Sequence, residues 1–218
     1  MEIFERLKGM IDASEQFTML EFGACDGYHT NQFIKLMRMS GKPFVFHAFE
    51  PERSNFKTCA IATQAHASAF TLWNMAVGAN EGTQPFYVSG GAKMVDGRPV
   101  EHYYGSSSIR APKMVTTAWP DMTFRETTAQ VTTLDAFAAA HLGDRIVDFI
   151  WADIQGAEVD LIRGGAKAME RVKYLYTEYC DAELYDGEVG RDALCAMLPG
   201  FEMVEDYGGD VLLKNKVL

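Results

Sequence analysis

An acid followed by a glycine turn is the clearest chemical feature of the chain. Glu21 ends an apolar stretch, and Gly23 and Gly27 follow it four residues apart, just before a helical pattern begins. Glycines let the backbone turn sharply and approach a ligand closely, and the amides of such a turn can hold a polar group. A carboxylate repels a pyrophosphate and attracts an ammonium group, so the turn favours S-adenosylmethionine, which has an amino group and a positive sulfonium. The alternative is a purely structural turn.

Two further apolar stretches end in groups that suit an adenosine. Glu50 and Pro51 follow residues 44–49, and an acid at the end of a second strand can accept both ribose hydroxyls. The alternative is that Glu50 favours the first turn of the next helix. Asn74 and Met75 suit the polar edge and the face of an adenine, although core packing accounts for Met75 equally well.

Alternating strands and helices must position these groups. Helical periodicity predicts an opening helix within residues 1–16, and later helices over 31–39, 54–64, 136–141 and up to residue 169. Apolar stretches predict strands over 19–22, 44–49, 70–78, 147–154 and 173–180, with a closing hairpin at 201–206 and 211–214 and an extra edge strand at 83–89. The pattern predicts one α/β domain over residues 1–218, with helices on both faces of the sheet.

Residues 90–128 interrupt this order with glycine, proline and serine turns and lose hydrophobic periodicity. A long insertion of this kind in a domain is typical of a lid or a mobile loop. The groups in it that could stack on or hydrogen-bond a polar substrate are His102, Tyr103, Tyr104, Arg110 and Trp119. A surface loop without a function is the alternative.

The overall charge limits the class of partner. The chain has 20 Lys and Arg against 30 Asp and Glu, a net charge of -10, which argues against DNA or RNA as a partner. No apolar stretch has the length of a membrane span, so no membrane partner is expected. The 4 cysteines form no Cys-x-x-Cys pair, which favours reduced thiols in a cytoplasmic protein without a secretory signal. The sequence does not indicate an oligomeric state.

Short motifs in consistent order resemble those of the FkbM family of S-adenosylmethionine-dependent methyltransferases. They cover residues 21–24, 49–51, 74–78, 106–108, 132–135, 153–158 and 210–213. The resemblance implies a class I methyltransferase fold, which is Rossmann-like, with a seven-stranded sheet whose last strand is antiparallel. It also implies O-methylation of a hydroxyl on a sugar or another small molecule. The chain departs from the family at Gln155, where Glu is more frequent, and at Trp151 and Cys25.

The resemblance also implies roles for individual residues. Glu21, Gly23 and Gly27 would line the methionine end of the cofactor, Glu50 the ribose, and Asn74 with Met75 the adenine edge. Asp153 would face the transferring methyl group. The full implied cofactor-binding set is Glu21, Gly23, Ala24, Gly27, Glu50, Pro51, Asn74, Met75 and Asp153.

Methylation of a hydroxyl needs a base, because a neutral hydroxyl is a poor nucleophile. Asp153 is the first candidate for this catalytic role, and Glu178 and His102 follow it. Asp153 and Glu178 could share a divalent metal, but without a clear third ligand a metal-independent reaction is expected.

Two other functions are compatible with part of the pattern. A catalytically silent S-adenosylmethionine-binding partner protein would keep Glu21 and Glu50 without needing Asp153. A nicotinamide-dependent oxidoreductase would share the sheet and the ribose contact, but its Gly-x-Gly-x-x-Gly motif is missing.

Overall fold

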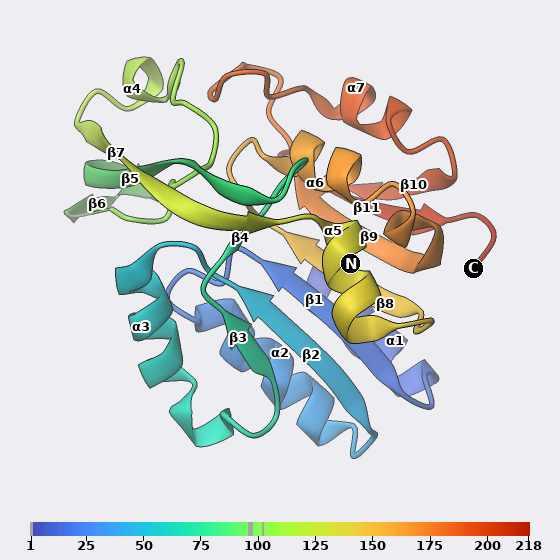
Figure 1. Cartoon of the computed structure of the whole chain (residues 1–218). Coiled ribbons are helices and arrows are strands. Elements are labelled where there is room, and N and C mark those ends of the chain that lie inside the picture. The colour runs from blue at the N-terminus through green and yellow to red at the C-terminus, as the bar shows by residue number, and fades with distance from the viewer. Residues whose placement is uncertain (1, 96–97, 102) are drawn as a thin grey trace.

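Seven strands form the central sheet of the computed structural model, which describes residues 2–95, 98–101 and 103–218 (Figure 1). Their order across the sheet is β10-β11-β9-β8-β1-β2-β3. The strands are β1 (Phe17–Phe22), β2 (Phe44–Phe49), β3 (Thr71–Trp73), β8 (Val147–Ala152), β9 (Val172–Glu178), β10 (Phe201–Asp206) and β11 (Asp210–Asn215). Only β11 runs antiparallel to its neighbours β9 and β10, whereas β8, β9, β1, β2 and β3 pair in parallel. The predicted α/β fold with a last antiparallel strand is therefore confirmed.

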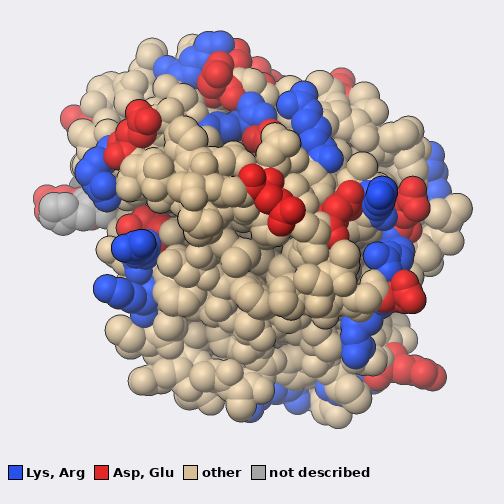
Figure 2. Space-filling view, in the orientation of Figure 1, with Lys and Arg blue, Asp and Glu red and all other residues tan. Residues whose placement is uncertain are grey.

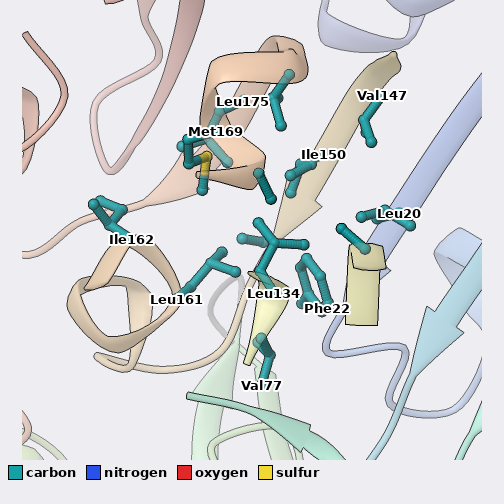
Figure 3. Close-up of a cluster of buried hydrophobic side chains, with 14 of the residues drawn as sticks. Leu20, Phe22, Val77, Leu134, Val147, Ile150, Leu161, Ile162, Met169 and Leu175 are labelled. Atoms are coloured by element: carbon teal, nitrogen blue, oxygen red, sulfur yellow. The ribbon is translucent and has the colours of Figure 1, made fainter. Parts of the chain in front are cut away.

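Helices cover both faces of this sheet. On one face lie α1 (Ile3–Ala13), α2 (Tyr28–Met39) and α3 (Arg53–Ala62), and on the other lie α5 (Leu134–Phe137), α6 (Glu158–Gly164) and α7 (Arg191–Ala196). Figure 3 shows the hydrophobic core on the face covered by α5, α6 and α7, where Leu134 and Leu161 of the helices pack against Phe22 and Ile150 of the sheet. Within the described part of the chain, no helix has the length and apolar character needed to cross a membrane.

Alternate side chains of β1 lie on opposite faces of the central sheet. Every residue of β1 is buried, as expected for a parallel strand covered on both faces. Leu20 and Phe22 belong to the core under α5 and α6, whereas Phe17 and Met19 belong to the core under α1 and α2. Because side chains alternate along a strand, Glu21 points toward α2.

Several helix boundaries differ from the prediction. Helix α2 begins three residues earlier than expected, at Tyr28. Thr133 caps α5 as predicted, since its hydroxyl accepts a hydrogen bond from the Ala136 amide at 3.1 Å, and a π-helical turn, Ala138–Leu142, follows. Short 3-10 turns occur at Gln64–His66 and Ala168–Arg171, so the helix expected to reach residue 169 is divided.

A second, four-stranded sheet has the order β4-β7-β5-β6 and lies beside the first in Figure 1. It contains β4 (Ala76–Val77), β5 (Gly82–Val95), β6 (Arg98–Glu101) and β7 (Met122–Thr132). Residues 70–78, expected to form the third strand and its exit, contain β3, which pairs with β2 in the central sheet, and then β4, a separate short strand that pairs with β7. The strand expected at 83–89 is present as part of β5, where it pairs with β7, and β6 pairs only with the later residues Ala92–Val95 of β5.

The insertion at residues 90–128 combines strands with loops. Strands β5 and β7 pair from Gly82 with Val131 to Gly91 with Met122, and the short helix α4 (Val115–Ala118) precedes β7. Many side chains of β7 are exposed, which explains why hydrophobic periodicity was weak there. A loop over residues 103–114 joins this sheet to α4 and lies against the carboxyl ends of the central strands.

Candidate active site

A cavity of about 450 Å³ lies at the carboxyl ends of β1, β2 and β8. Four segments form its wall: the loop after β1, the loop after β2, the turn from β3 into β4, and the loop after β8. The segment 103–109 covers its remaining side. This volume is within the range of small-molecule and cofactor sites, and its location is the usual ligand position in open α/β sheets.

The loop after β1 is held close to its neighbours. The amides of Gly23 and Ala24 donate to the Phe49 carbonyl at 3.0 and 2.9 Å. Gly23 has a φ of 92°, and a Cβ atom there would lie 1.9 Å from the Asp153 carbonyl oxygen. Only glycine at position 23 permits this close contact between the loops after β1 and β8. Gly23 and Ala24 both line the cavity.

Glu50 brings a buried carboxyl to the same cavity. One of its oxygens accepts from the Cys25 amide at 2.8 Å and the other from the Glu52 amide at 2.7 Å. Burial raises the pKa of Glu50 to about 8, although these two hydrogen bonds lower it. Carboxyl oxygens have further lone pairs, so Glu50 can also accept hydroxyl groups from the cavity. Pro51 and Met75 line the cavity beside it, as expected.

Three residues expected to touch the cofactor are not part of the described cavity lining. Glu21 points to α2, where one of its oxygens accepts from the Thr30 hydroxyl at 2.8 Å. The Asn74 amide group donates to the Glu50 and Pro51 carbonyls at 2.9 and 3.1 Å, so it supports the loop after β2. Gly27 serves helix packing, since a Cβ there would lie 3.0 Å from the Cys59 sulfur.

Glu21 is nevertheless an unusual group. It is 1% exposed, and its Oε1 atom has no hydrogen-bond partner among the described residues. Burial, together with the charges of Glu50 and Asp153, raises the pKa of Glu21 to about 8, although the hydrogen bond from Thr30 lowers it. Glu21 therefore lies outside the described cavity lining, and its contact with a cofactor amino group stays a prediction.

Asp153 and Glu178 meet through Gln155. Asp153 lines the cavity, and the Gln155 side-chain amide donates to its Oδ1 atom at 2.8 Å and to Glu178 Oε2 at 2.7 Å. Burial, followed by the charge of Asp153, raises the pKa of Glu178 well above its usual value. Glu178 ends β9 and is not in the described lining, so it reaches the cavity through Gln155.

The chain also brings groups to this region that the sequence did not single out. His29 lines the cavity, and burial lowers its pKa. Lys93 of β5 places its Nζ atom 4.3 Å from the Trp119 ring centre and 4.8 Å from that of Tyr103. Burial lowers the pKa of Lys93, whereas the charges of Glu178 and Asp153 raise it. The third candidate base, His102, lies outside the described residues.

The 103–109 segment is anchored on both sides of the cavity. On one side the Asn55 side chain donates to the Tyr104 carbonyl at 3.4 Å. On the other, the Tyr185 hydroxyl donates to the Ser106 carbonyl at 2.7 Å, and the Ser108 hydroxyl donates to the Ile154 carbonyl at 3.5 Å. These contacts suit the predicted lid role of the insertion, which stays a prediction.

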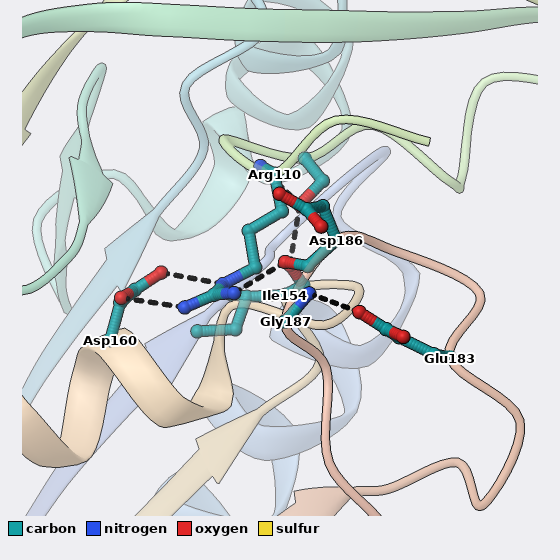
Figure 4. A network of polar contacts seen from close by, with 7 residues as sticks. Arg110, Ile154, Asp160, Glu183, Asp186 and Gly187 are labelled. Atoms are coloured by element: carbon teal, nitrogen blue, oxygen red, sulfur yellow. Dashed lines mark hydrogen bonds and ion pairs between the residues drawn. The ribbon is translucent and has the colours of Figure 1, made fainter. Parts of the chain in front are cut away.

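Arg110 has a structural position that differs from the expected substrate contact. Its guanidinium donates to both Asp160 oxygens, at 2.7 and 2.9 Å, and to the Asp186 carbonyl (Figure 4). The Asp186 amide in turn donates to the Ala111 carbonyl. Arg110 therefore joins the loop after Ser108 to α6 and to the segment after β9.

We expect Arg110→Met to lower the free energy of unfolding by about 2 kcal/mol, because Asp160 would lose its partner in a mostly buried pair. The side chains of Arg110 and Asp160 are 14% and 15% exposed, against 49% and 37% for Lys113 and Glu183. Lys113→Met, in an exposed pair, is thus the control and should cost much less stability than Arg110→Met in the same urea titration. Equal losses of unfolding free energy in the two variants would show that the Arg110–Asp160 pair does not stabilise the fold more than an exposed pair does.

Glu158 at the start of α6 gives the fold a pH dependence. It is 4% exposed, accepts from the Ile154 amide at 3.1 Å, and burial raises its pKa from 4.5 to about 8. A raised carboxyl pKa contributes stability that is complete below 4.5 and is lost as the pH rises through about 8.

Between pH 5 and pH 9, the wild type should therefore lose at least about 1 kcal/mol more stability than Glu158→Gln, which stays uncharged. Urea unfolding at the two pH values measures this difference, with the exposed Glu170→Gln as control. Parallel curves for wild type and Glu158→Gln would show that Glu158 does not titrate in this range.

The seven-stranded sheet with its antiparallel β11 and the cavity at the ends of its parallel strands have the architecture of the class I methyltransferase fold. The model of the Methyltransferase FkbM domain matches residues 21–208, and the chain belongs to this family. The protein is accordingly an S-adenosylmethionine-dependent methyltransferase, as the FkbM resemblance predicted.

Two relatives place the chain more closely. It is 32% identical over 205 residues to the 2-O-methyltransferase NoeI of Sinorhizobium fredii (strain NBRC 101917 / NGR234), covering 92% of this chain and 80% of NoeI. Its fold is similar to the crystal structure of Methyltransferase FkbM from Methylobacillus flagellatus KT, with a TM-score of 0.53 and 16% identity. That match covers 92% of this chain, which spans only 44% of the Methylobacillus chain.

Proposed function

We propose that the protein methylates a hydroxyl oxygen of a saccharide or another small molecule, with Asp153 as the base. The observation that carries this proposal is the single cavity lined by both Glu50 and Asp153, one carboxyl for an adenosine ribose and one for the reacting hydroxyl. NoeI is named a 2-O-methyltransferase, which supports oxygen as the acceptor atom.

The residues of the cavity fit the cofactor. The backbone of Gly23 and Ala24 approaches the cavity without bulky side chains, and Glu50 supplies acceptors for ribose hydroxyls. Phe49, Met75 and Val77 give the cavity an apolar wall of the kind that an adenine ring needs. When bound, S-adenosylmethionine supplies an electrophilic methyl group on its sulfonium.

The chain must then position the acceptor and remove its proton. Alignment of the two reactants supplies most of the rate increase in such a displacement. The acceptor hydroxyl would lose its proton to an Asp153 oxygen as it takes the methyl group, while the carbon–sulfur bond breaks and the cofactor leaves as the neutral thioether S-adenosylhomocysteine. Tyr103, Ser107 and Ser108 line the same cavity and supply a ring and hydroxyls for orienting a polar acceptor.

The surface supports a small acceptor in preference to a nucleic acid. On the face in Figure 2, Lys and Arg are interspersed with Asp and Glu, and the residues drawn in colour form no continuous basic patch there. With a net charge of -10, the protein offers little of the attraction that binding to a phosphate backbone needs. The four cysteines are free, which supports a reducing compartment such as the cytoplasm.

Calorimetric titration with S-adenosylhomocysteine tests the cofactor site. We expect micromolar binding by the wild type and at least about tenfold weaker binding by Glu50→Gln, a loss of about 1.4 kcal/mol for the ribose acceptor. Glu81→Gln, at an exposed site, is the control and should bind like the wild type.

The oxidoreductase alternative is tested in the same experiment by titrating NAD, which should not bind. Binding of NAD without binding of S-adenosylhomocysteine would reverse the assignment. After cofactor binding is established, a set of methyl glycosides serves as acceptors, with release of S-adenosylhomocysteine as the readout. A catalytically silent cofactor-binding protein would bind S-adenosylhomocysteine but methylate none of the glycosides tested.

A further inference from the structure

Gln155 contacts both carboxyls at the ends of β8 and β9, and these carboxyls also interact directly through a side-chain hydrogen bond between Glu178 and Asp153. One nitrogen, Nε2, lies 2.8 Å from Asp153 Oδ1 and 2.7 Å from Glu178 Oε2. An amide nitrogen has two N–H donors, so it can satisfy one oxygen of each carboxyl at once. These two oxygens are therefore already bound to the protein.

The backbone holds Gln155 in this position. Gln155 has a φ of 56°, a left-handed conformation that non-glycine side chains adopt infrequently, and Gly156 follows with a φ of 85°. The Tyr185 hydroxyl lies 3.4 Å from the Gln155 oxygen, and the Tyr185 side chain packs against Gly156, where a Cβ would lie 2.8 Å from the Tyr185 Cβ and 3.1 Å from the ring. Such a turn persists because its surroundings determine it, and strained turns of this kind cluster at functional sites.

We propose that Gln155 is a positioning residue whose amide takes the place of a bridging divalent cation between Asp153 and Glu178. This inference rests on the proposed function, in which Asp153 is the base. A metal ion that bridged these two oxygens would have to displace the amide nitrogen, because the hydrogens on that nitrogen point at the oxygens and would repel a cation.

The proposal makes an asymmetric prediction for residue 155. Gln155→Glu keeps the size of the side chain but replaces the two donors by a third carboxylate. Three carboxylates around one space form an oxygen-rich site that suits Mn²⁺ or Mg²⁺. A single atom exchange should thus turn a metal-free arrangement into a metal site.

Titration of the full chain with Mn²⁺ tests this prediction. The electron paramagnetic resonance signal of the free ion measures how much Mn²⁺ remains unbound at each step. We expect Gln155→Glu to bind Mn²⁺ at least about tenfold more tightly than the wild type. The double variant Gln155→Glu with Glu178→Gln should lose this gain. Gln64→Glu adds the same charge at an exposed position and should match the wild type.

A second variant covers the case in which Gln155→Glu does not fold. Gln155→Gly suits the left-handed backbone and removes the amide, so its Mn²⁺ affinity should lie between those of the wild type and Gln155→Glu. Equal affinity for Mn²⁺ in the wild type and in the folded variants, tight or weak, would overturn the proposal.

Titration of the same samples with S-adenosylhomocysteine separates this result from the proposed function. If the wild type does not bind S-adenosylhomocysteine, the proposed cofactor site is wrong. The Mn²⁺ comparison would still report on Gln155.

Discussion

Asp153→Asn is expected to lower kcat by a factor of about 10² to 10⁴, the usual contribution of a general base. Asn keeps the size of the side chain and an oxygen that can accept from Gln155, but it cannot take the proton of the acceptor hydroxyl. Binding of S-adenosylhomocysteine should change less than about threefold, because Asp153 is assigned to the reacting hydroxyl and not to the ribose. The measurement is methyl transfer at saturating cofactor to the glycoside that the wild type methylates.

The matched control for this prediction is Asp144→Asn, at an exposed position away from the cavity lining. It removes the same charge and should leave kcat unchanged. If Asp153→Asn retained wild-type kcat, the base would be another group, and Glu178 and His29 would be the next residues to replace. A parallel loss of cofactor affinity and kcat would instead assign Asp153 to cofactor binding.

Gly23→Ala is expected to lower the free energy of unfolding by at least about 4 kcal/mol, or to prevent folding, because two penalties combine. The added Cβ would lie 1.9 Å from the Asp153 carbonyl oxygen, which is backbone and cannot move without shifting the loop after β8. The φ of 92° also disfavours any side chain. Thermal and urea unfolding measure the loss.

Gly41→Ala separates the two penalties. Gly41 also has a positive φ, 69°, but a Cβ there would meet nothing within 4 Å. It should therefore cost only about 1 to 2 kcal/mol from the backbone conformation. Similar losses for both variants would mean that the contact with Asp153 is relieved at little cost and does not hold the two loops together.

The central sheet could be predicted because its strands are strongly apolar. Strands β1 and β8 are buried on both faces, so they read as apolar stretches that end in polar residues. The polar ends mark the edge at which ligands bind in such sheets, and this placed Glu50 and Asp153 correctly at the cavity.

The second sheet could not be predicted equally well. Its strands β5 and β7 are stabilised by pairing with each other over a long sequence separation, and exposed side chains hide their periodicity. Lys93 belongs to β5, so its position over the Tyr103 and Trp119 rings could not be predicted without knowledge of that sheet. The division of residues 70–78 into β3 and β4 also depends on partners that come later in the chain.

The sequence by itself determined the α/β class, the glycine loop, and the two carboxyls, Glu50 and Asp153, that face the cavity. These follow from local patterns, since apolar stretches and strand ends are adjacent in the chain. The tertiary structure alone decided that Glu21 points to α2 and that Gln155 joins Asp153 to Glu178. The physical reason is that a side chain's partner depends on which face of the sheet it occupies and which strands are neighbours, and both are settled only when the sheet forms.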